Sequence, residues 1–498
     1  MIRNALIPLA LLGLAVPAQT HANAQAKAPA ASHAPSLQQD VEAILATAPK
    51  GTRFGLLVVD GNGREIVSLN AEQRFIPAST AKLFTTAAAY ALLPDMAQPD
   101  RAGGAQVWLE KDSRKGQAGL NVVLFGRGDA RMSSAPDCAV NCLAELADAV
   151  ARSTRQVHDV IGDATFWPDQ RWVPGMSWNN IGTDSGTAVA ALNLDDNELG
   201  LSVRPGAVGQ APQVQVPGYY GLRNEAVTVA AGGQTRLFVE RAVNGSELRL
   251  YGTIPANAAP WTDRLGVDDP AHYAAWALKE LLIARGVKVT GQIRARHRGP
   301  ALADQVADGA SPVPASASGP KPLASLTPPP LAQDVVTINQ VSQNLHAQAL
   351  FRRLGGASQS EQWASAAQRK LLEQAGIDPV GFELWDGSGM STYNRISPRA
   401  AIGLLRWAGR QPWGTDWFAS LPIAGREGTL KRRFAGTPLE GNLAAKTGSL
   451  NATSALVGTF LSARGQRLFF AIFASDIPAR SSALPAMDAA LARIAARN

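Results

Sequence analysis

The sequence predicts an α+β fold in which helices flank an antiparallel sheet and a long, largely β insert interrupts the domain. Two strand-like runs, 53–60 and 65–69, are joined by Gly61-Asn62-Gly63, which is typical of a β-hairpin. Two more such runs, 455–460 and 467–473, lie near the other end of the chain. Helical periodicity surrounds both pairs, and short strand-like runs broken by Gly, Pro and Asp fill the stretch between them.

The first residues have the features of a secretory signal peptide. Arg3 precedes an apolar run from Ala5 to Val16, and Ala22-Asn23-Ala24 has the small residues of a cleavage site. Residues 1–26 are therefore predicted to be removed during export to the periplasm. Because no later segment is long and apolar enough to span a bilayer, we expect at most a peripheral membrane association.

Changes in composition and periodicity divide the rest of the chain. A capped helix beginning at Ser36, the hairpin and the helix after Ser79 form a first unit, and the helices, strands and final helix after 327 return to it. The insert carries a smaller β module and ends in a Pro-, Ala- and Ser-rich connection. The predicted parts are 36–92 and 327–498 for the divided domain, 93–195 and 256–326 for the outer insert, and 196–255 for the inner β domain.

Cysteine content and charge limit the classes of function. The two cysteines, Cys138 and Cys142, are four residues apart, which allows either a local disulfide or two free thiols and gives no zinc-site pattern. The net charge of +7 comes from scattered Lys and Arg, with only Lys431-Arg432-Arg433 clustered. We therefore expect no nucleic-acid partner; an anionic envelope polymer or solubility alone accounts for the charge. Nothing in the sequence indicates an oligomeric state, a metal or a cofactor.

Ser79-Thr80-Ala81-Lys82 opens an apolar helical run and places a hydroxyl and an amine one turn apart. A lysine in a partly dry pocket loses its charge and can take the proton of a neighbouring serine. The position of Ser79 near a helix N-terminus also favours developing negative charge. The same spacing recurs at Ser318-Gly319-Pro320-Lys321, but the Gly and Pro disfavour the helix that would align the pair.

Two further motifs supply the other groups that a serine acyl-transfer site needs. Lys446-Thr447-Gly448-Ser449 offers a cation on a strand edge, with Gly448 allowing a substrate backbone to approach. Ser342-Gln343-Asn344 offers a hydroxyl and an amide at the start of a helical run. Ser-x-Asn also occurs at Ser68, Ser177 and Ser449, and we prefer Ser342 for its order in the chain and its helical context.

The three motifs, in this order, resemble those of serine D-Ala-D-Ala peptidases and the related β-lactamases. Five more segments are similar to the D-alanyl-D-alanine carboxypeptidase/endopeptidase family of low-molecular-mass penicillin-binding proteins, the penicillin-binding protein 4 type. These segments are 124–129, 191–197, 386–391, 421–425 and 428–430. The resemblance covers nearly all of the chain after the signal peptide. It implies a penicillin-binding, β-lactamase-like transpeptidase domain, with β-lactams as covalent inhibitors and peptidoglycan stem peptides as substrates.

The resemblance also implies a role for each motif residue. Ser79 is expected to be the acylated nucleophile, Lys82 its general base, and Ser342 with Lys446 the proton relay to the leaving amine. Asn344 is expected to hold the substrate amide, and Thr447 and Ser449 the terminal carboxylate. The N–H groups of Ser79 and Ser449 are expected to form the oxyanion hole.

One departure concerns the substrate side chain. Relatives that read the ammonium of diaminopimelate are expected to carry an acidic residue after a Trp in the insert, whereas Trp178-Asn179-Asn180 has Asn180 there. Asp184 lies four residues further on, where a surface loop is the simpler interpretation. We also interpret Asp386 and Ser388 as turn residues, and His346 as a helix-face histidine near the pocket rim.

Alternative functions make different demands on the sequence. A β-lactamase needs a dedicated deacylating base, and no separate Glu motif supplies one. An inactive envelope-binding scaffold would not need Ser79, Lys82, Ser342 and Lys446 together. No Gly-x-Ser-x-Gly elbow, His-Glu-x-x-His motif or phosphate-binding loop is present. The prediction is a serine-type D-Ala-D-Ala carboxypeptidase with DD-endopeptidase activity.

Overall fold

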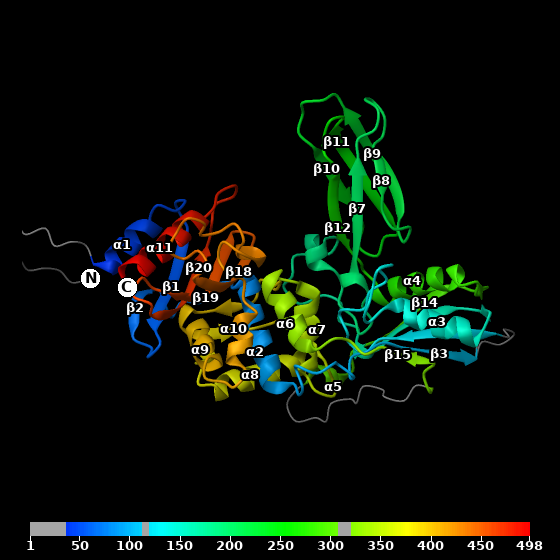
Figure 1. Ribbon diagram of the computed structural model, residues 1–498, viewed down its shortest axis with the longest axis horizontal. Coiled ribbons are helices and arrows are strands. Elements are labelled where there is room, and N and C mark those ends of the chain that lie inside the picture. The colour runs from blue at the N-terminus through cyan, green and yellow to red at the C-terminus, as the bar shows by residue number, and fades with distance from the viewer. Residues whose placement is uncertain (1–35, 112–118, 307–319) are drawn as a thin grey trace, which may run out of the picture. The chain divides into compact units, whose positions relative to one another are not determined.

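The computed structural model describes residues 36–111, 119–306 and 320–498 (Figure 1). The predicted signal peptide and Ser318 lie outside these residues. Among the described helices, none has both the length and the apolar character required to cross a bilayer.

A five-stranded antiparallel sheet unites the two ends of the chain. Its order is β18-β19-β20-β1-β2, so that strands from both ends pair side by side at β1 and β20 (Figure 1). The strands are β1 (Arg53–Asp60), β2 (Glu65–Leu69), β18 (Leu443–Leu450), β19 (Thr453–Leu461) and β20 (Arg467–Ser475). This pairing confirms the divided α+β domain and leaves β18 at one edge of the sheet.

Helices cover both faces of this sheet and so bury its central strands on both sides. In β1, Leu56 and Val58 join the cluster that contains α1 (Leu37–Leu45) and α11 (Leu484–Arg497). Leu57 and Val59 point the other way, into the cluster formed with α2 (Lys82–Leu92) and α9 (Pro398–Ala408). This alternation follows from the two-residue period of a strand. The remaining helices of this domain are α6 (Leu331–Gln340), α7 (Asn344–Arg353), α8 (Glu361–Gln374) and α10 (Gly414–Ala419). The short strands β16 (Phe382–Glu383) and β17 (Arg395–Ile396) pair near them.

The outer insert is built on a mixed sheet of order β14-β6-β4-β3-β15. Its strands are β3 (Gln106–Lys111), β4 (Leu120–Phe125), β6 (Val160–Pro168), β14 (Ile293–Arg298) and β15 (Ala324–Ser325). Three helices, α3 (Leu143–Ser153), α4 (Pro270–Ala284) and α5 (Leu302–Gln305), and the pair β5 (Gln156–Val157) and β13 (Lys288–Val289) complete it. A disulfide joins Cys138 to Cys142, the residue before α3.

The inner part of the insert consists of two three-stranded sheets. One contains β7 (Glu198–Arg204), β8 (Gln213–Gln215) and β12 (Trp261–Gly266), and the other contains β9 (Gly221–Val229), β10 (Arg236–Glu240) and β11 (Glu247–Pro255). Strand β12 pairs with residues 198–203 of β7, so this sheet includes residues up to Gly266.

Candidate active site

Ser79 lies in a tight turn that leads into α2. Thr80 closes this turn by donating from both N and Oγ1 to the carbonyl of Pro77, at 3.2 and 2.7 Å. Ala78 has a φ of 47°, a left-handed conformation that is unfavourable for a residue with a side chain. The 3₁₀ turn η1 (Ala78–Ala81) thus holds Ser79 just before the helix, with Lys82 as the first residue of α2.

Lys82 is the centre of a buried hydrogen-bond network. Its Nζ lies 2.9 Å from Ser79 Oγ, 2.6 Å from Asn344 Oδ1 and 2.5 Å from the carbonyl oxygen of Ser388. The side chain is 0% exposed. Burial lowers the pKa of Lys82 to about 7, although the negative charge of Asp386 acts in the opposite direction. A substantial fraction of Lys82 is therefore neutral at neutral pH and can accept the proton of Ser79.

Lys446 forms a second amine and hydroxyl pair with Ser342. Its Nζ donates to Ser342 Oγ at 2.9 Å and to the carbonyl of Thr447 at 3.0 Å. Burial lowers the pKa of Lys446 well below its usual value, and the positive charge of Lys82 lowers it further. Ser342 has a φ of 68°, so the hydroxyl is presented from a left-handed turn immediately before α7. Because the charge of Lys82 affects the pKa of Lys446, the Ser79–Lys82 pair and the Ser342–Lys446 pair interact electrostatically.

Alternate residues of β18 direct their backbone N–H and C=O groups to its outer edge, on the side opposite β19. Ala445 N donates to Pro422 O, and Leu443 O accepts from Ala424 N, so odd-numbered residues of the strand direct their backbone groups to this edge. The two-residue period places the N–H and C=O of Thr447 and Ser449 there as well. Such an edge can bind an extended peptide by adding it as a further strand.

Gly448 lets this edge lie against the nucleophile. A Cβ at Gly448 would be 2.5 Å from Pro77 O and 3.2 Å from Ser79 N. Gly389, whose φ is +84°, approaches the same turn, since its Cβ would be 2.0 Å from Ala78 O. Both contacts are backbone to backbone, so no side-chain movement could make room for a larger residue.

The structure brings together the motif residues that the sequence singled out. Ser79, Lys82 and Asn344 are in direct contact, Ser342 contacts Lys446, and Gly448 adjoins the backbone of Ser79. Thr447 Oγ1 lies 2.8 Å from the hydroxyl of Thr429, a residue of the 428–430 segment for which the sequence had indicated no role. Ser449 is exposed on the strand edge.

Asp386 and Ser388 form the turn that the sequence predicted, but this turn is also part of the site. The buried carboxylate of Asp386 accepts from Ser388 Oγ at 2.6 Å and from Met390 N at 2.9 Å. These bonds fix the backbone so that the carbonyl of Ser388 meets Lys82. The contact was missed because a backbone acceptor far along the chain leaves no pattern in the sequence.

The insert reaches the site through the segment that carries Asn180. Asn344 Nδ2 donates to the carbonyl of Ser185 at 2.8 Å. The carbonyl of Asn180 accepts from Thr183 N and Oγ1, which closes a local turn. Asp184 forms an ion pair with Arg264 at 3.4 Å in this loop.

The interpretation of His346 as a rim residue was wrong. Its side chain is 5% exposed, and its two ring nitrogens lie 2.8 Å from carboxylate oxygens of Asp334 and Asp196. Burial alone would lower the pKa of His346, but the two carboxylates raise it to about 9. His346 is therefore a buried cation that ties α7 to the insert, two residues from Asn344.

Within residues 36–111, 119–306 and 320–498, no group of three or more His, Cys, Asp and Glu side chains is arranged to hold a metal ion. The groups gathered at Ser79 are a nucleophile, two amines, an amide and a strand edge. Their arrangement suits acyl transfer through a serine.

Comparisons with known proteins agree with this chemistry. The profile of the D-Ala-D-Ala carboxypeptidase 3 (S13) family matches residues 37–498. A D-alanyl-D-alanine carboxypeptidase of Actinomadura sp. (strain R39) is 32% identical over 484 residues, which cover 93% of this chain and 84% of the relative. The crystal structure of penicillin-binding protein 4 from Haemophilus influenzae is similar in fold, with a TM-score of 0.74 and 21% identity over 91% of this chain and 97% of that chain. A second structure of that protein, in complex with a β-lactam, has a TM-score of 0.68 and 20% identity, with the same coverage of both chains.

Proposed function

Since the chain belongs to the D-Ala-D-Ala carboxypeptidase 3 (S13) family and is a serine-type D-Ala-D-Ala carboxypeptidase, we propose that it trims peptidoglycan stem peptides and also cleaves the cross-links between them. In both reactions an acyl group that ends in D-Ala is transferred to Ser79 and then to water. Only the leaving amine differs: it belongs to free D-Ala in the first case and to the side chain of a neighbouring stem peptide in the second.

In the proposed acylation, Ser79 Oγ attacks the carbonyl of the penultimate D-Ala while neutral Lys82 takes the hydroxyl proton. The carbonyl oxygen becomes an oxyanion that the N–H groups of Ser79 and Ser449 stabilise. The C–N bond then breaks, and the proton that Lys82 took passes through Ser342, which Lys446 positions, to the leaving amine. Water subsequently attacks the acyl-serine and gives a proton to Lys82, which returns it to the oxygen of Ser79 as the ester bond breaks.

Substrate binding in this proposal uses the edge of β18. The extended stem peptide lies along this edge, with its terminal carboxylate at the hydroxyls of Thr447 and Ser449 and an amide group at Asn344. The observation that carries the assignment is the meeting of the two amine and hydroxyl pairs, each with an Nζ to Oγ distance of 2.9 Å.

A β-lactam presents a strained carbonyl of the same kind, so we also propose that penicillins acylate Ser79. The β-lactam complex of the Haemophilus influenzae protein supports this proposal by its similarity in fold. The predicted signal peptide supports export to the periplasm, where stem peptides and cross-links are accessible.

Incubation of the purified protein with a fluorescent penicillin tests the nucleophile. We expect stoichiometric label on the peptide that contains Ser79, none in Ser79→Ala, and normal labelling in Ser318→Ala, which removes the other Ser-x-x-Lys match. Rapid release of hydrolysed drug would instead indicate a β-lactamase, and an unlabelled folded wild type would refute the acyl-serine mechanism.

Defined muropeptides test the two peptidase activities. Mass spectrometry should show loss of one D-Ala from a monomeric pentapeptide and conversion of a cross-linked dimer to monomers. Loss of D-Ala with an intact dimer would refute the endopeptidase activity and retain the carboxypeptidase.

A further inference from the structure

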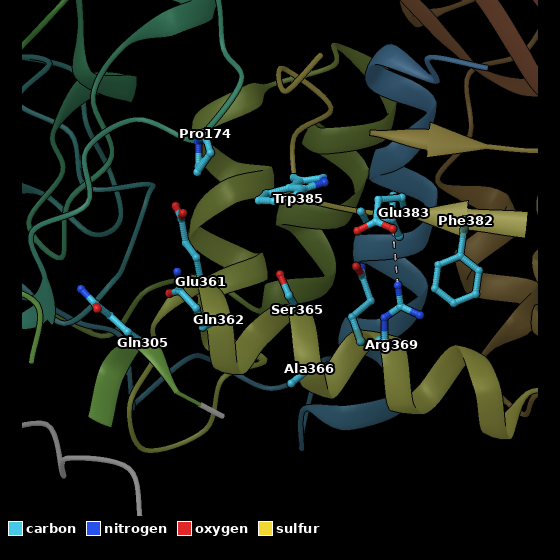
Figure 2. A pocket seen from close by; sticks show the side chains of 12 residues that line it. Pro174, Gln305, Glu361, Gln362, Ser365, Ala366, Arg369, Phe382, Glu383 and Trp385 are labelled. Carbon is cyan, nitrogen blue, oxygen red and sulfur yellow. Dashed lines mark ion pairs between the residues drawn. The ribbon is translucent and has the colours of Figure 1, made fainter. Parts of the chain in front are cut away.

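A cavity of about 340 Å³ lies between α8 and the segment that begins with β16 and leads to Asp386 (Figure 2). We call it the Trp385 pocket. Gln362, Ser365, Gln368 and Arg369 line it from α8, Glu383 and Trp385 line it from the segment that follows, and Pro174 contributes from the insert. None of these side chains belongs to the acyl-transfer site described above.

One buried polar group of the pocket is unsatisfied. Gln368 is 1% exposed, and its Nε2 has no hydrogen-bond partner among the described residues. A buried donor without a partner is costly unless a ligand supplies an acceptor. Because Gln368 lines the cavity, a hydroxyl or carbonyl oxygen of a bound molecule would satisfy it.

Charged side chains in the pocket are already paired. Arg369 lies 3.8 Å from the carboxylate of Glu383, an ion pair that Figure 2 shows at one end of the cavity. Glu361, at the other end, is buried against Arg352 at 3.1 Å. The balanced charges give no attraction for a phosphate or another polyanion, whereas amide and hydroxyl groups remain to bind a neutral polar molecule.

Trp385 supplies an aromatic surface for such a molecule. The side chain is 43% exposed, and an edge contact with Tyr393 at 5.5 Å orients its ring. In Figure 2 the indole lies across the cavity, between Pro174 and the Arg369–Glu383 pair. A flat apolar face next to amide side chains suits a pyranose ring, whose C–H faces are apolar and whose edge carries hydroxyl groups.

We propose that the Trp385 pocket binds an N-acetylated sugar of the glycan strand to which the stem peptide is attached. This inference rests on the proposed function, because it assigns the peptidoglycan substrate a second point of contact. The sugar ring stacks on Trp385, and an acetamido or hydroxyl oxygen accepts from Gln368 Nε2.

The position of the pocket matches the length of the substrate. Trp385 lies three residues before Ser388, whose carbonyl contacts Lys82, so their Cα atoms are at most about 11 Å apart. The sugar is joined to the far end of the stem peptide, three to four residues from the scissile carbonyl, or roughly 10–14 Å when extended. One substrate molecule can therefore reach both the pocket and Ser79.

Two substrates that differ only in the sugar test the proposal. We compare kcat/KM for release of D-Ala from a pentapeptide and from the same pentapeptide carrying the N-acetylglucosaminyl-N-acetylmuramyl disaccharide. A stacking contact and one hydrogen bond should favour the sugar-bearing substrate roughly ten-fold, mainly through KM. Trp385→Ala and Gln368→Met should abolish this preference and leave kcat/KM for the free pentapeptide unchanged.

Phe238→Ala is the matched control, since Phe238 is another exposed aromatic residue, 53% exposed and stacked on Tyr251 in the inner β domain. It should retain the preference. Equal kcat/KM for the two substrates in the wild type would refute sugar binding in the Trp385 pocket and would leave the proposed peptidase activity supported. If neither substrate were cleaved, the proposed function would fail, and calorimetric titration of the wild type with the disaccharide alone would decide the pocket: binding weakened by Trp385→Ala supports it, and no binding overturns it.

Discussion

Raising the pH should accelerate acylation of Ser79 in proportion to the neutral fraction of Lys82. With a pKa of about 7, this fraction is about 1% at pH 5, about 50% at pH 7 and nearly complete above pH 8. The second-order rate constant for a fluorescent penicillin should therefore rise about fifty-fold from pH 5 to pH 7 and no more than about two-fold beyond. Quenched labelling at a series of pH values, with the β-lactam in excess, measures this constant.

Asp386→Asn provides the discriminating variant. The carboxylate of Asp386 raises the pKa of Lys82, against the larger effect of burial, so its removal should move the midpoint of the pH profile to lower pH. Asparagine keeps an oxygen that can accept from Ser388 Oγ, as Asp386 does at 2.6 Å. The variant should consequently acylate faster than the wild type near pH 6.

A profile with no midpoint near neutrality, or one that keeps rising toward the ordinary pKa of lysine near 10, would refute neutral Lys82 as the base. A midpoint in Asp386→Asn that stayed in place or moved upward would contradict the assigned electrostatics. Circular dichroism of both proteins at each pH separates these outcomes from unfolding.

Three further perturbations test other parts of the structure. Lys82→Ala should abolish acylation with little change in Tm, because the lost hydrogen bonds are offset by removal of a costly buried amine; acylation at the normal rate would exclude Lys82 as the base. Gly448→Ala should slow acylation about a hundred-fold or more, since a Cβ 2.5 Å from Pro77 O displaces the oxyanion donors. Gly218→Ala, where a Cβ meets nothing within 4 Å, is its control. If both variants were acylated at the same rate, the role of the strand edge would be contradicted. His346→Gln should lower stability at pH 6 by about 3 kcal/mol in urea unfolding and have little effect at pH 10. The raised pKa of His346 means that its contribution is complete below about pH 6.5 and is lost as the pH rises through about 9, so an effect independent of pH would contradict the ion pairs.

Local features of the fold and site could be predicted from the sequence because their physical causes are local. The one-turn separation of Ser79 and Lys82 requires only a helix start, and the structure gives 2.9 Å between their side-chain atoms. The hairpin at 53–69 and the strand pair at 455–473 also depend on neighbouring residues, and both are confirmed. The Lys446-Thr447-Gly448-Ser449 motif was expected on a strand edge, and it lies in β18 at the edge of the sheet.

Contacts between distant segments could not be predicted in the same way. The carbonyl that Ser388 offers to Lys82 has no side-chain signature, and 306 residues separate the two. His346 contacts Asp196, 150 residues away in the insert, and no local pattern in the sequence indicates that contact. Strand β12 is likewise defined by its pairing with β7, more than fifty residues earlier, because it carries little periodicity of its own.

The pairing of β1 with β20 has a consequence for the order in which the enzyme is made. Synthesis begins at the N-terminus, so a growing chain exposes Ser79 long before the ribosome adds Lys446 and the three strands β18 to β20. Until then β1 has no neighbour on the side that β20 will occupy, and the nucleophile lacks its strand edge. A polypeptide that ends before β18 consequently lacks both Lys446 and the strand edge, so the site around Ser79 is complete only when the last segment has closed the sheet.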